Sequence, residues 1–354
     1  MSMPKFSITE IQPTGRYYEH EGTNYGYPFA EVEILNKPIT PRENFRRFME
    51  RKDYCWVPNL AVDFNSFFCT QNPDCQAMTF EGGKDSFGVP WVAVEHNEAL
   101  PALVMPGNPM LKDICDWRNL PFPDPSKWDW EGAEQQFAHV KRDDRANYCF
   151  LPEAYFERLI TLMDFNNAAM ALVTDPEETA AFMERLTDLY IEILRHYKER
   201  FDVDLVFISD DWGTQRSPMF SADTCREVIA PAYRRFVHAA HEMGVYTMTH
   251  SCGVMGGLVD VITELETDMW QPQIELNPMD EIIDDYGDRL FFNSYALIED
   301  REDLDEFRAV NTELARRYLS KDCMFIEYAA WGDNSDEKNR IIYEILRKAA
   351  TREL

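Results

Sequence analysis

A histidine and a cysteine separated by one residue form the pair in this chain whose types fit metal binding or proton transfer. His250 and Cys252 lie in Thr249-His250-Ser251-Cys252-Gly253, directly after a short apolar run. Imidazole and thiolate both bind zinc, and imidazole also serves as a general acid or base. Taken alone, the pair also fits a buried histidine beside an inert core cysteine, so both interpretations stay open.

Two adjacent acids, Asp210 and Asp211, follow a second apolar run and precede Trp212. Positioned carboxyl groups can donate or accept protons during catalysis. The same pair could instead cap a helix or form a surface ion pair. Trp212 fits either the wall of a substrate pocket or the core.

The same arrangement recurs along the second half of the chain. Short apolar runs occur at 205–208, 245–248, 268–270, 290–292 and 324–326, each followed by polar or aromatic residues. These are Asp210, Asp211 and Trp212; His250 and Cys252; Gln273; Asn293 and Tyr295; and Glu327, Tyr328 and Trp331. In a (β/α) barrel the carboxyl ends of all strands meet on one face, where active sites lie. We therefore predict that these residues form one site, with Asp210, Asp211, His250 and Glu327 as catalytic candidates and the others, apart from Cys252, as substrate-binding candidates.

The elements that must position these residues are short buried strands alternating with helices. Each run is apolar on successive residues, which is typical of strands covered on both faces. Amphipathic segments lie between them, and helices are expected over 41–52, 151–163 and 177–200. Alternating strands and helices predict parallel βαβ units. We predict one (β/α)8 TIM-type barrel over 1–354, with an irregular N-terminal extension over 1–50 and an insertion over 80–145.

Composition narrows the possible partners. Hydrophobic residues make up 45% of the 354 residues, which suffices for a large core. The formal net charge is −28, from 63 acidic and 35 basic residues, which disfavours nucleic acid and anionic membranes as partners. No apolar run reaches the ~18 residues of a membrane span. The N-terminus leads into no secretory signal, and the eight scattered cysteines fit reduced thiols in a cytoplasmic protein.

Several segments together resemble the uroporphyrinogen decarboxylase superfamily, in its corrinoid-dependent methyltransferase branch. The resemblance covers roughly residues 150–345. It rests on Asp210-Asp211-Trp212-Gly213-Thr214-Gln215, His250-Ser251-Cys252-Gly253, Trp270-Gln271-Pro272-Gln273, Met279-Asp280 and the segment 286–292. The family fold is a (β/α)8 barrel. Its members either decarboxylate uroporphyrinogen without a cofactor or transfer methyl groups to or from a corrinoid held by a separate protein. The decarboxylase carries an Arg-rich motif, whereas the corresponding segment 64–69 contains no Arg.

The resemblance also implies a zinc site, from which this chain departs. Methyltransferases of the family that act on coenzyme M bind zinc through a His-x-Cys pair and a later Cys. His250 and Cys252 match the pair, but Ala329 and Ala330 stand where the later Cys is expected. Because catalytic zinc normally takes three protein ligands, we expect Glu327 to supply the third, or the site to hold no metal.

One thiolate beside carboxylates suits cleavage of an ether more than activation of a thiol. An aryl ether leaves as a phenolate, whose conjugate acid has a pKa of ~10, so a proton donor or Lewis acid lowers the barrier. We expect an O-demethylase-like methyltransferase that moves methyl from a small donor to the Co(I) corrinoid (cobalamin) of a partner protein, with a homodimer as its oligomeric state. The alternatives are a decarboxylase of a carboxylated substrate and an inactive barrel that serves as a scaffold for the corrinoid protein.

Overall fold

Seven parallel strands form the centre of the molecule. The computed structural model describes residues 4–19, 23–24, 27–28, 30–94, 101–138 and 143–354. The strands are β3 (Phe64–Phe67), β7 (Ala146–Leu151), β8 (Leu205–Ser209), β9 (Tyr246–Ser251), β10 (Met269–Pro272), β11 (Phe291–Ser294) and β12 (Met324–Ile326). Their order in space follows their order in the chain, and all pair in parallel, as successive βαβ units require.

An additional short segment lies against β12, the strand at one edge of this sheet. Asn59 forms a parallel bridge with Ile326, and the Ile326 N–H donates to the Pro58 carbonyl at 3.2 Å. The Asn59 side chain continues the pairing, since it donates to the Tyr328 carbonyl at 2.7 Å and accepts from the Tyr328 N–H at 3.0 Å. This segment takes the place of a first barrel strand, reduced to a single bridge. The predicted TIM-type α/β fold is confirmed in this form.

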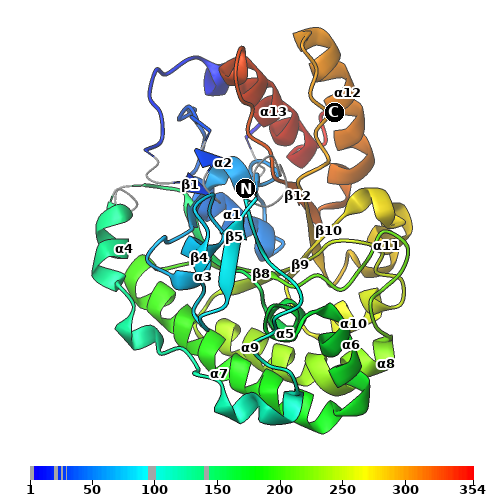
Figure 1. The fold of residues 1–354 in the computed structure, drawn as a ribbon. Coiled ribbons are helices and arrows are strands. Elements are labelled where there is room, and N and C mark those ends of the chain that lie inside the picture. Colours follow the sequence, from blue (N-terminus) through cyan, green and yellow to red (C-terminus); the bar gives the residue numbers. More distant parts are fainter. Residues whose placement is uncertain (1–3, 20–22, 25–26, 29, 95–100, 139–142) are drawn as a thin grey trace.

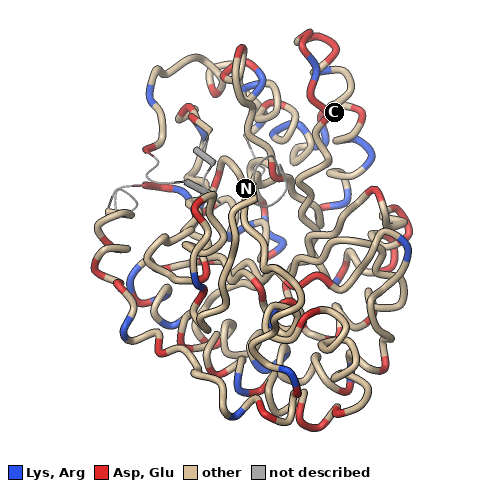
Figure 2. The backbone as a smooth tube through the Cα atoms, in the orientation of Figure 1, with Lys and Arg blue, Asp and Glu red and all other residues tan. Residues whose placement is uncertain are grey.

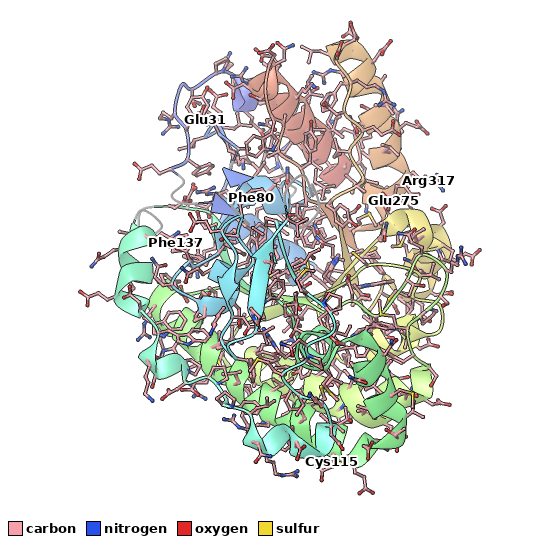
Figure 3. The ribbon with its side chains drawn as sticks, viewed as in Figure 1. Glu31, Phe80, Cys115, Phe137, Glu275 and Arg317 are labelled. Atoms are coloured by element: carbon pink, nitrogen blue, oxygen red, sulfur yellow. The ribbon has the colours of Figure 1, made fainter. Side chains whose placement is uncertain are left out.

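Helices surround the sheet (Figure 1). They are α1 (Pro41–Met49), α2 (Leu60–Asp63), α5 (Tyr155–Met163), α6 (Phe165–Thr174), α7 (Pro176–Phe201), α9 (Ala230–Glu242), α10 (Leu258–Glu264), α11 (Met279–Tyr286), α12 (Leu304–Tyr318) and α13 (Ser335–Ala350). The short helix α8 (Ala222–Thr224) leads through a π-helical turn, Cys225–Ile229, into α9. The interior is densely filled by side chains, as in other barrels of this type (Figure 3).

Several sequence-based boundaries were wrong. The helix expected from residue 151 begins at Tyr155, because Leu151 pairs with Ile208 as the last residue of β7. The strands also run further than expected. His250 pairs with Gln271 inside the β9–β10 ladder, and Asn293 pairs with Phe325. Several polar residues expected in loops are therefore strand residues whose directions the ladder fixes.

The segment between β3 and β7 forms a separate layer at one end of the barrel. It contains α3 (Pro73–Ala77), an antiparallel sheet of β4 (Gly83–Lys84), β5 (Pro90–Ala93) and β6 (Ala102–Val104), and α4 (Trp130–Gln136). Trp91 of β5 joins a small apolar cluster with Phe68 and Phe150, against which Phe207 packs. A two-stranded ribbon, β1 (Thr23–Asn24) with β2 (Tyr27–Pro28), precedes α1.

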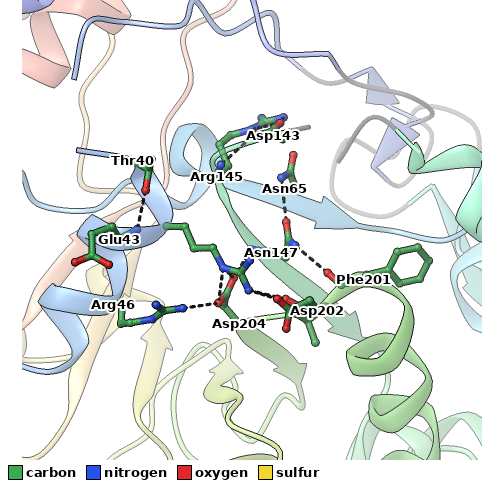
Figure 4. Close-up of polar contacts among 12 residues, drawn as sticks. Thr40, Glu43, Arg46, Asn65, Asp143, Arg145, Asn147, Phe201, Asp202 and Asp204 are labelled. Atoms are coloured by element: carbon green, nitrogen blue, oxygen red, sulfur yellow. Dashed lines mark hydrogen bonds and ion pairs between the residues drawn. The ribbon is translucent and has the colours of Figure 1, made fainter. Parts of the chain in front are cut away.

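The N-terminal ends of the strands are closed by α1 and by ion pairs. Phe45 of α1 packs edge-on against Phe64 of β3, with ring centroids 4.7 Å apart. Arg42 donates to the Asp202 carboxylate at 2.6 Å and to that of Asp204 at 2.9 Å. Figure 4 shows these two carboxylates at the end of the strands. Asp204 in turn accepts from the Asn147 N–H at 3.0 Å. This end of the barrel is therefore held by paired charges.

Acidic side chains are spread over the whole chain rather than gathered on one element (Figure 2). No helix in the described parts of the chain is both long and apolar enough to cross a membrane.

Candidate metal and active site

Three side chains of different chemistry converge at the C-terminal ends of β8 and β9. Asp211, His250 and Cys252 each offer one ligand atom, and these atoms all lie within 4.8 Å of one another. The His250 Nε2 is 3.2 Å from the Cys252 Sγ and 3.6 Å from the Asp211 Oδ1. The Cys252 N–H also donates to Asp211 Oδ1 at 2.6 Å. We call these three residues the metal trio.

The close approach of two loops brings the trio together. Ser209 at the end of β8 pairs with His250, so the segments that follow β8 and β9 start side by side. A Cβ on Gly213 would lie 2.6 Å from the Cys252 carbonyl oxygen. Gly253 has a φ of +84°, and a Cβ there would lie 2.3 Å from the Gly213 carbonyl carbon. Neither position accepts a side chain without moving a loop, so the two glycines permit the trio to form.

Two amides hold the loop after β9 from the other side. Gln273 accepts the Gly253 N–H at 3.1 Å, and Asn277 donates to the Gly253 carbonyl at 2.9 Å. Gln273 was predicted to bind substrate; in the structure its side chain supports the loop that carries Cys252. This contact makes it a positioning residue for the trio.

Burial disfavours the charged forms of His250 and Cys252. Burial lowers the pKa of His250, against the raising effect of the nearby Asp211. Burial also raises the pKa of the Cys252 thiol to about 12, and Asp211 and Glu157 add to that shift. A bound divalent cation reverses this balance, because it stabilises thiolate and carboxylate and requires neutral imidazole.

The donor set fits zinc. Nitrogen, sulfur and oxygen are all common zinc ligands, and three protein ligands with a fourth open position are typical of catalytic sites. Asp211, rather than Glu327, completes the set, because Glu327 lies outside the three-residue cluster. The expectation that Glu327 supplies the third ligand stays a prediction, and this cluster offers Asp211 in its place.

Glu327 instead forms a second polar group at the same end of the barrel. Its Oε2 accepts from Gln271 Nε2 at 2.7 Å, and Gln271 lies beside His250 in the neighbouring strand. Burial raises the pKa of Glu327 to about 7, while the hydrogen bond from Gln271 acts in the opposite direction. A carboxyl group with this pKa can donate a proton near neutral pH.

A group of acids behind the trio includes a residue that the sequence analysis missed. Burial raises the pKa of Glu157 well above its ordinary value, and Glu153, Asp211 and Asp210 add to the shift. Glu157 is close enough to Cys252 to raise the pKa of its thiol. The sequence contains the same pattern here, because Glu153 and Glu157 follow β7 just as the other candidates follow their strands. Recognising 146–151 as a strand would have revealed it.

Other predicted residues do not face the opening of the site. Asp210 is fully buried; it accepts from the Glu157 N–H at 2.9 Å and from the Trp212 indole at 2.7 Å. Trp212 is also fully buried and packs against Tyr233 and Phe220. Both side chains contribute to the packing of β8 against its helices, and the predicted catalytic role of Asp210 and substrate-binding role of Trp212 stay predictions.

The remaining predicted site residues differ in how deeply they are buried. Asn293 is fully buried on β11 beside Gln271. Tyr328 packs against Phe307 of α12, away from the trio. Tyr295 and Trp331 are exposed, by 42% and 57%, and the Tyr295 ring centroid is 6.4 Å from that of His250. Of the predicted aromatic residues, Tyr295 is therefore the one placed beside the trio.

Comparisons with known proteins agree with this architecture. Residues 153–288 match the family described as uroporphyrinogen decarboxylase (URO-D), and this range includes Asp211, His250 and Cys252. No curated protein sequence matches the chain. A methyltransferase from Methanosarcina mazei is similar in structure, with a TM-score of 0.60 and 12% identity, over 86% of this chain and 98% of that one.

More distant structural similarities are also found. An endo-β-1,4-xylanase of glycoside hydrolase family 10 from Gloeophyllum trabeum has a TM-score of 0.40 and 12% identity, over 63% of this chain and 82% of that one. A xylose isomerase-like TIM-barrel protein from Mycobacterium smegmatis has a TM-score of 0.36 and 13% identity, over 68% and 88%. These two are too dissimilar to bear on function. The family match confirms the resemblance to the uroporphyrinogen decarboxylase superfamily for the central part of the barrel, and the first structure supports the fold.

Proposed function

We propose that this chain is a corrinoid-dependent methyltransferase that takes a methyl group from a small donor, of which an aryl methyl ether fits best. The acceptor is the Co(I) corrinoid of a partner protein. The observation that carries the proposal is the metal trio of Asp211, His250 and Cys252 at the C-terminal ends of the strands. Its family context and the similarity to a methyltransferase fold support the same reaction class.

The composition of the trio favours an oxygen leaving group. Asp211, His250 and Cys252 would hold a zinc ion, which when bound supplies a Lewis acid for an oxygen atom of the donor. A site with two thiolates leaves a bound thiolate substrate nucleophilic. A site with one thiolate and one carboxylate is harder and more electron-withdrawing, and it suits an ether oxygen.

Methyl transfer requires one bond to form as another breaks. The electron pair of Co(I) forms the new bond to the methyl carbon, and the methyl–oxygen bond breaks with its pair left on oxygen. The products are a methylated Co(III) corrinoid and a phenolate. Glu327, with a pKa of about 7, can supply the proton that converts the phenolate to a phenol.

The aromatic side chain beside the trio fits a planar donor. Tyr295 is partly exposed next to His250, and its pKa is raised to about 12 by burial and by neighbouring acids, so its hydroxyl stays neutral. Two further aromatic rings, Phe207 and Phe150, lie at the same end of the barrel, and Phe207 stacks on His250 with centroids 5.8 Å apart. These rings give an aromatic donor apolar surface close to the trio.

Anaerobic incubation with free cob(I)alamin tests the proposal directly. The zinc-loaded protein is mixed with a panel of methoxybenzenes carrying hydroxyl or carboxyl groups, with methanol and methylamines for comparison. We expect the spectrum of methylcob(III)alamin and an equal amount of the demethylated phenol. His250→Ala should show neither, while His238→Ala on the exposed surface of α9 should match the unaltered protein. Absence of methylcob(III)alamin with every donor, by the unaltered protein, would contradict the proposal.

A further inference from the structure

Gln271 lies at the centre of a buried hydrogen-bond chain that ends on Glu327. Its Nε2 donates to the Asn293 Oδ1 and to the Glu327 Oε2, the latter at 2.7 Å. Gln271 is 3% exposed and Asn293 is fully buried, so these two amides lie deeper in the barrel than the partly exposed Glu327. Both hydrogens of the Gln271 amide are used, which fixes the direction of this side chain.

This contact decides which oxygen of Glu327 carries a proton. An amide N–H can only donate, so Glu327 Oε2 must act as an acceptor. In the neutral acid the acceptor is the carbonyl oxygen, and the proton is left on Oε1. Oε1 makes no hydrogen bond within the described structure and keeps some exposed surface, so solvent can reach it.

Asn293 has a supporting position in the chain. Its Oδ1 accepts the second hydrogen of Gln271, and its Nδ2 is buried without a hydrogen-bond partner. Burying an unpaired amide donor costs stability, of the order of 1–3 kcal/mol, so packing alone gives no reason to prefer Asn over an apolar residue here. Orienting the Gln271 amide does give such a reason.

We propose that Gln271 and Asn293 are positioning residues that present the acidic proton of Glu327 on its exposed oxygen, facing the methyl donor. This inference rests on the proposed function for its catalytic consequence, because it assigns the proton that the leaving oxygen receives. The arrangement itself is a property of the free protein. It selects donors whose leaving atom accepts a proton, such as ethers and alcohols, over methylated quaternary amines, which leave as neutral amines.

Other titratable groups face Glu327 without changing this assignment. Tyr148 of β7 and Tyr295 after β11 are close enough for Glu327 to raise the pKa of each, and burial is the main cause of both shifts. Both phenols therefore stay neutral when Glu327 titrates. Loss of the Gln271 hydrogen bond should raise the pKa of Glu327, because that bond lowers it in the intact protein.

Infrared spectroscopy of the free protein tests the arrangement without any substrate. Below neutral pH, the carboxyl C=O band that disappears in Glu327→Gln belongs to Glu327. In Gln271→Met this band should move to higher frequency, because its carbonyl oxygen loses a hydrogen bond, and it should persist to higher pH. An unmoved band in a folded Gln271→Met protein would overturn the inference, whatever the activity.

A double-mutant cycle tests the catalytic part with a donor found by the cob(I)alamin assay. Gln271→Met should lower kcat at least tenfold with little change in KM, and the fall of the rate at high pH should move to higher pH. In the Glu327→Gln background the same change should have almost no further effect, since Gln271 acts through Glu327. Asn293→Ala should shift kcat in the same direction by a smaller factor.

Additive losses in the cycle would overturn the positioning role, because they are the signature of general damage to the fold. If no donor is turned over but the infrared band moves as expected, the arrangement stands and the proposed function fails. The two conclusions are therefore tested separately.

Discussion

Two carboxyl groups at opposite ends of the barrel, Asp202 and Glu327, have pKa values shifted in opposite directions. At the N-terminal end, burial alone would raise the pKa of Asp202, but hydrogen bonds from Lys198 and Arg42 bring it below its ordinary value. At the C-terminal end, Glu327 is hydrogen-bonded to a neutral amide, and burial raises its pKa to about 7. Paired carboxylates stabilise a fold, whereas a carboxyl group kept without a cation retains a proton that it can give away.

The difference also separates two kinds of positioning. Arg42 joins α1 to the loop before β8 through ion pairs with the carboxylates of Asp202 and Asp204. Asp211, His250 and Cys252 lie within 4.8 Å of one another without a Lys or Arg partner among the described residues. A cation bound between these side chains would stabilise the thiolate and carboxylate forms. The contrast supports the proposed metal site at the C-terminal end, whereas paired charges hold the N-terminal end together.

The largest expected effect follows from removing a residue of the trio. His250→Ala should lower the rate of methyl transfer by about 10³-fold or more, because a lost Lewis acid costs several kcal/mol of transition-state stabilisation. The rate of cob(I)alamin methylation measures this. The thermal unfolding midpoint should stay within a few degrees of the unaltered protein. A His250→Ala protein with near-normal transfer would remove the trio from the mechanism.

Replacing Glu327 should produce the next largest effect. Glu327→Gln should lower kcat by about 10²-fold, at the low end of what a general acid supplies. In the unaltered protein, kcat should fall as pH rises through about 7, because the neutral acid is the proton donor. That fall should be missing in Glu327→Gln, and an unchanged pH profile would contradict the assignment.

Glu327 also affects how the free energy of unfolding depends on pH, in the direction opposite to that of a paired carboxylate. The folded-state pKa of Glu327 is raised from 4.5 to about 7, so the folded protein holds this proton more tightly than the unfolded chain. Its contribution to the free energy of unfolding is therefore present below pH 4.5 and is lost as pH rises to about 7. Urea unfolding should show Glu327→Gln gaining stability relative to the unaltered protein above neutral pH. A relative loss there would contradict the raised pKa.

Arg42→Ala tests the other end of the barrel. It should lower the free energy of unfolding by about 1–3 kcal/mol, because the buried Asp204 carboxylate loses its cation. Urea unfolding measures the loss, with Arg316→Ala on the exposed surface of α12 as a control that should change little. Methyl transfer by the folded protein should be unaffected. Lost transfer at unchanged stability would break the proposed division between the two ends.

The smallest expected effect is at Tyr295. Tyr295→Phe removes a neutral hydroxyl but keeps the ring beside His250, so KM for an aromatic donor should rise by roughly 2- to 10-fold, the value of one hydrogen bond. Tyr295→Ala should raise KM further, with kcat nearly constant. Steady-state kinetics distinguish the two. A larger effect on kcat than on KM would place Tyr295 among the proton donors instead.

The sequence was sufficient for five of the seven parallel strands, β8 to β12, and for the end of the sheet at which their polar residues gather. Short runs apolar on successive residues have few alternatives to buried parallel strands, and their carboxyl ends must meet. It was insufficient for the direction of individual side chains, because that depends on where each strand ends. Trp212 and Asp210 follow β8 as directly as Asp211 does, yet they point into the packing behind it and Asp211 points into the site.

The third member of the metal trio could not be identified from the sequence either. The family pattern predicts a later cysteine after the last strand, and this chain has none. We therefore expected Glu327, which follows the same strand, to be the third ligand. Asp211 comes instead from β8, and its distance to His250 depends on the contact of Gly213 with Gly253, which no local pattern reveals. Glu157 was missed for a related reason, since no strand was expected over 146–151 and Leu151 was taken for the start of a helix.

The most direct test of the central claim is whether the trio binds a metal ion. After loading with zinc and removal of excess, the protein should retain one zinc ion per chain, and the cobalt(II)-substituted protein should show a thiolate-to-cobalt charge-transfer band. Cys252→Ser should lose the band and bind zinc more than about 100-fold more weakly, while Cys115→Ser at an exposed position should keep both. Failure of the unaltered protein to retain zinc, or an unchanged band in Cys252→Ser, would contradict the account.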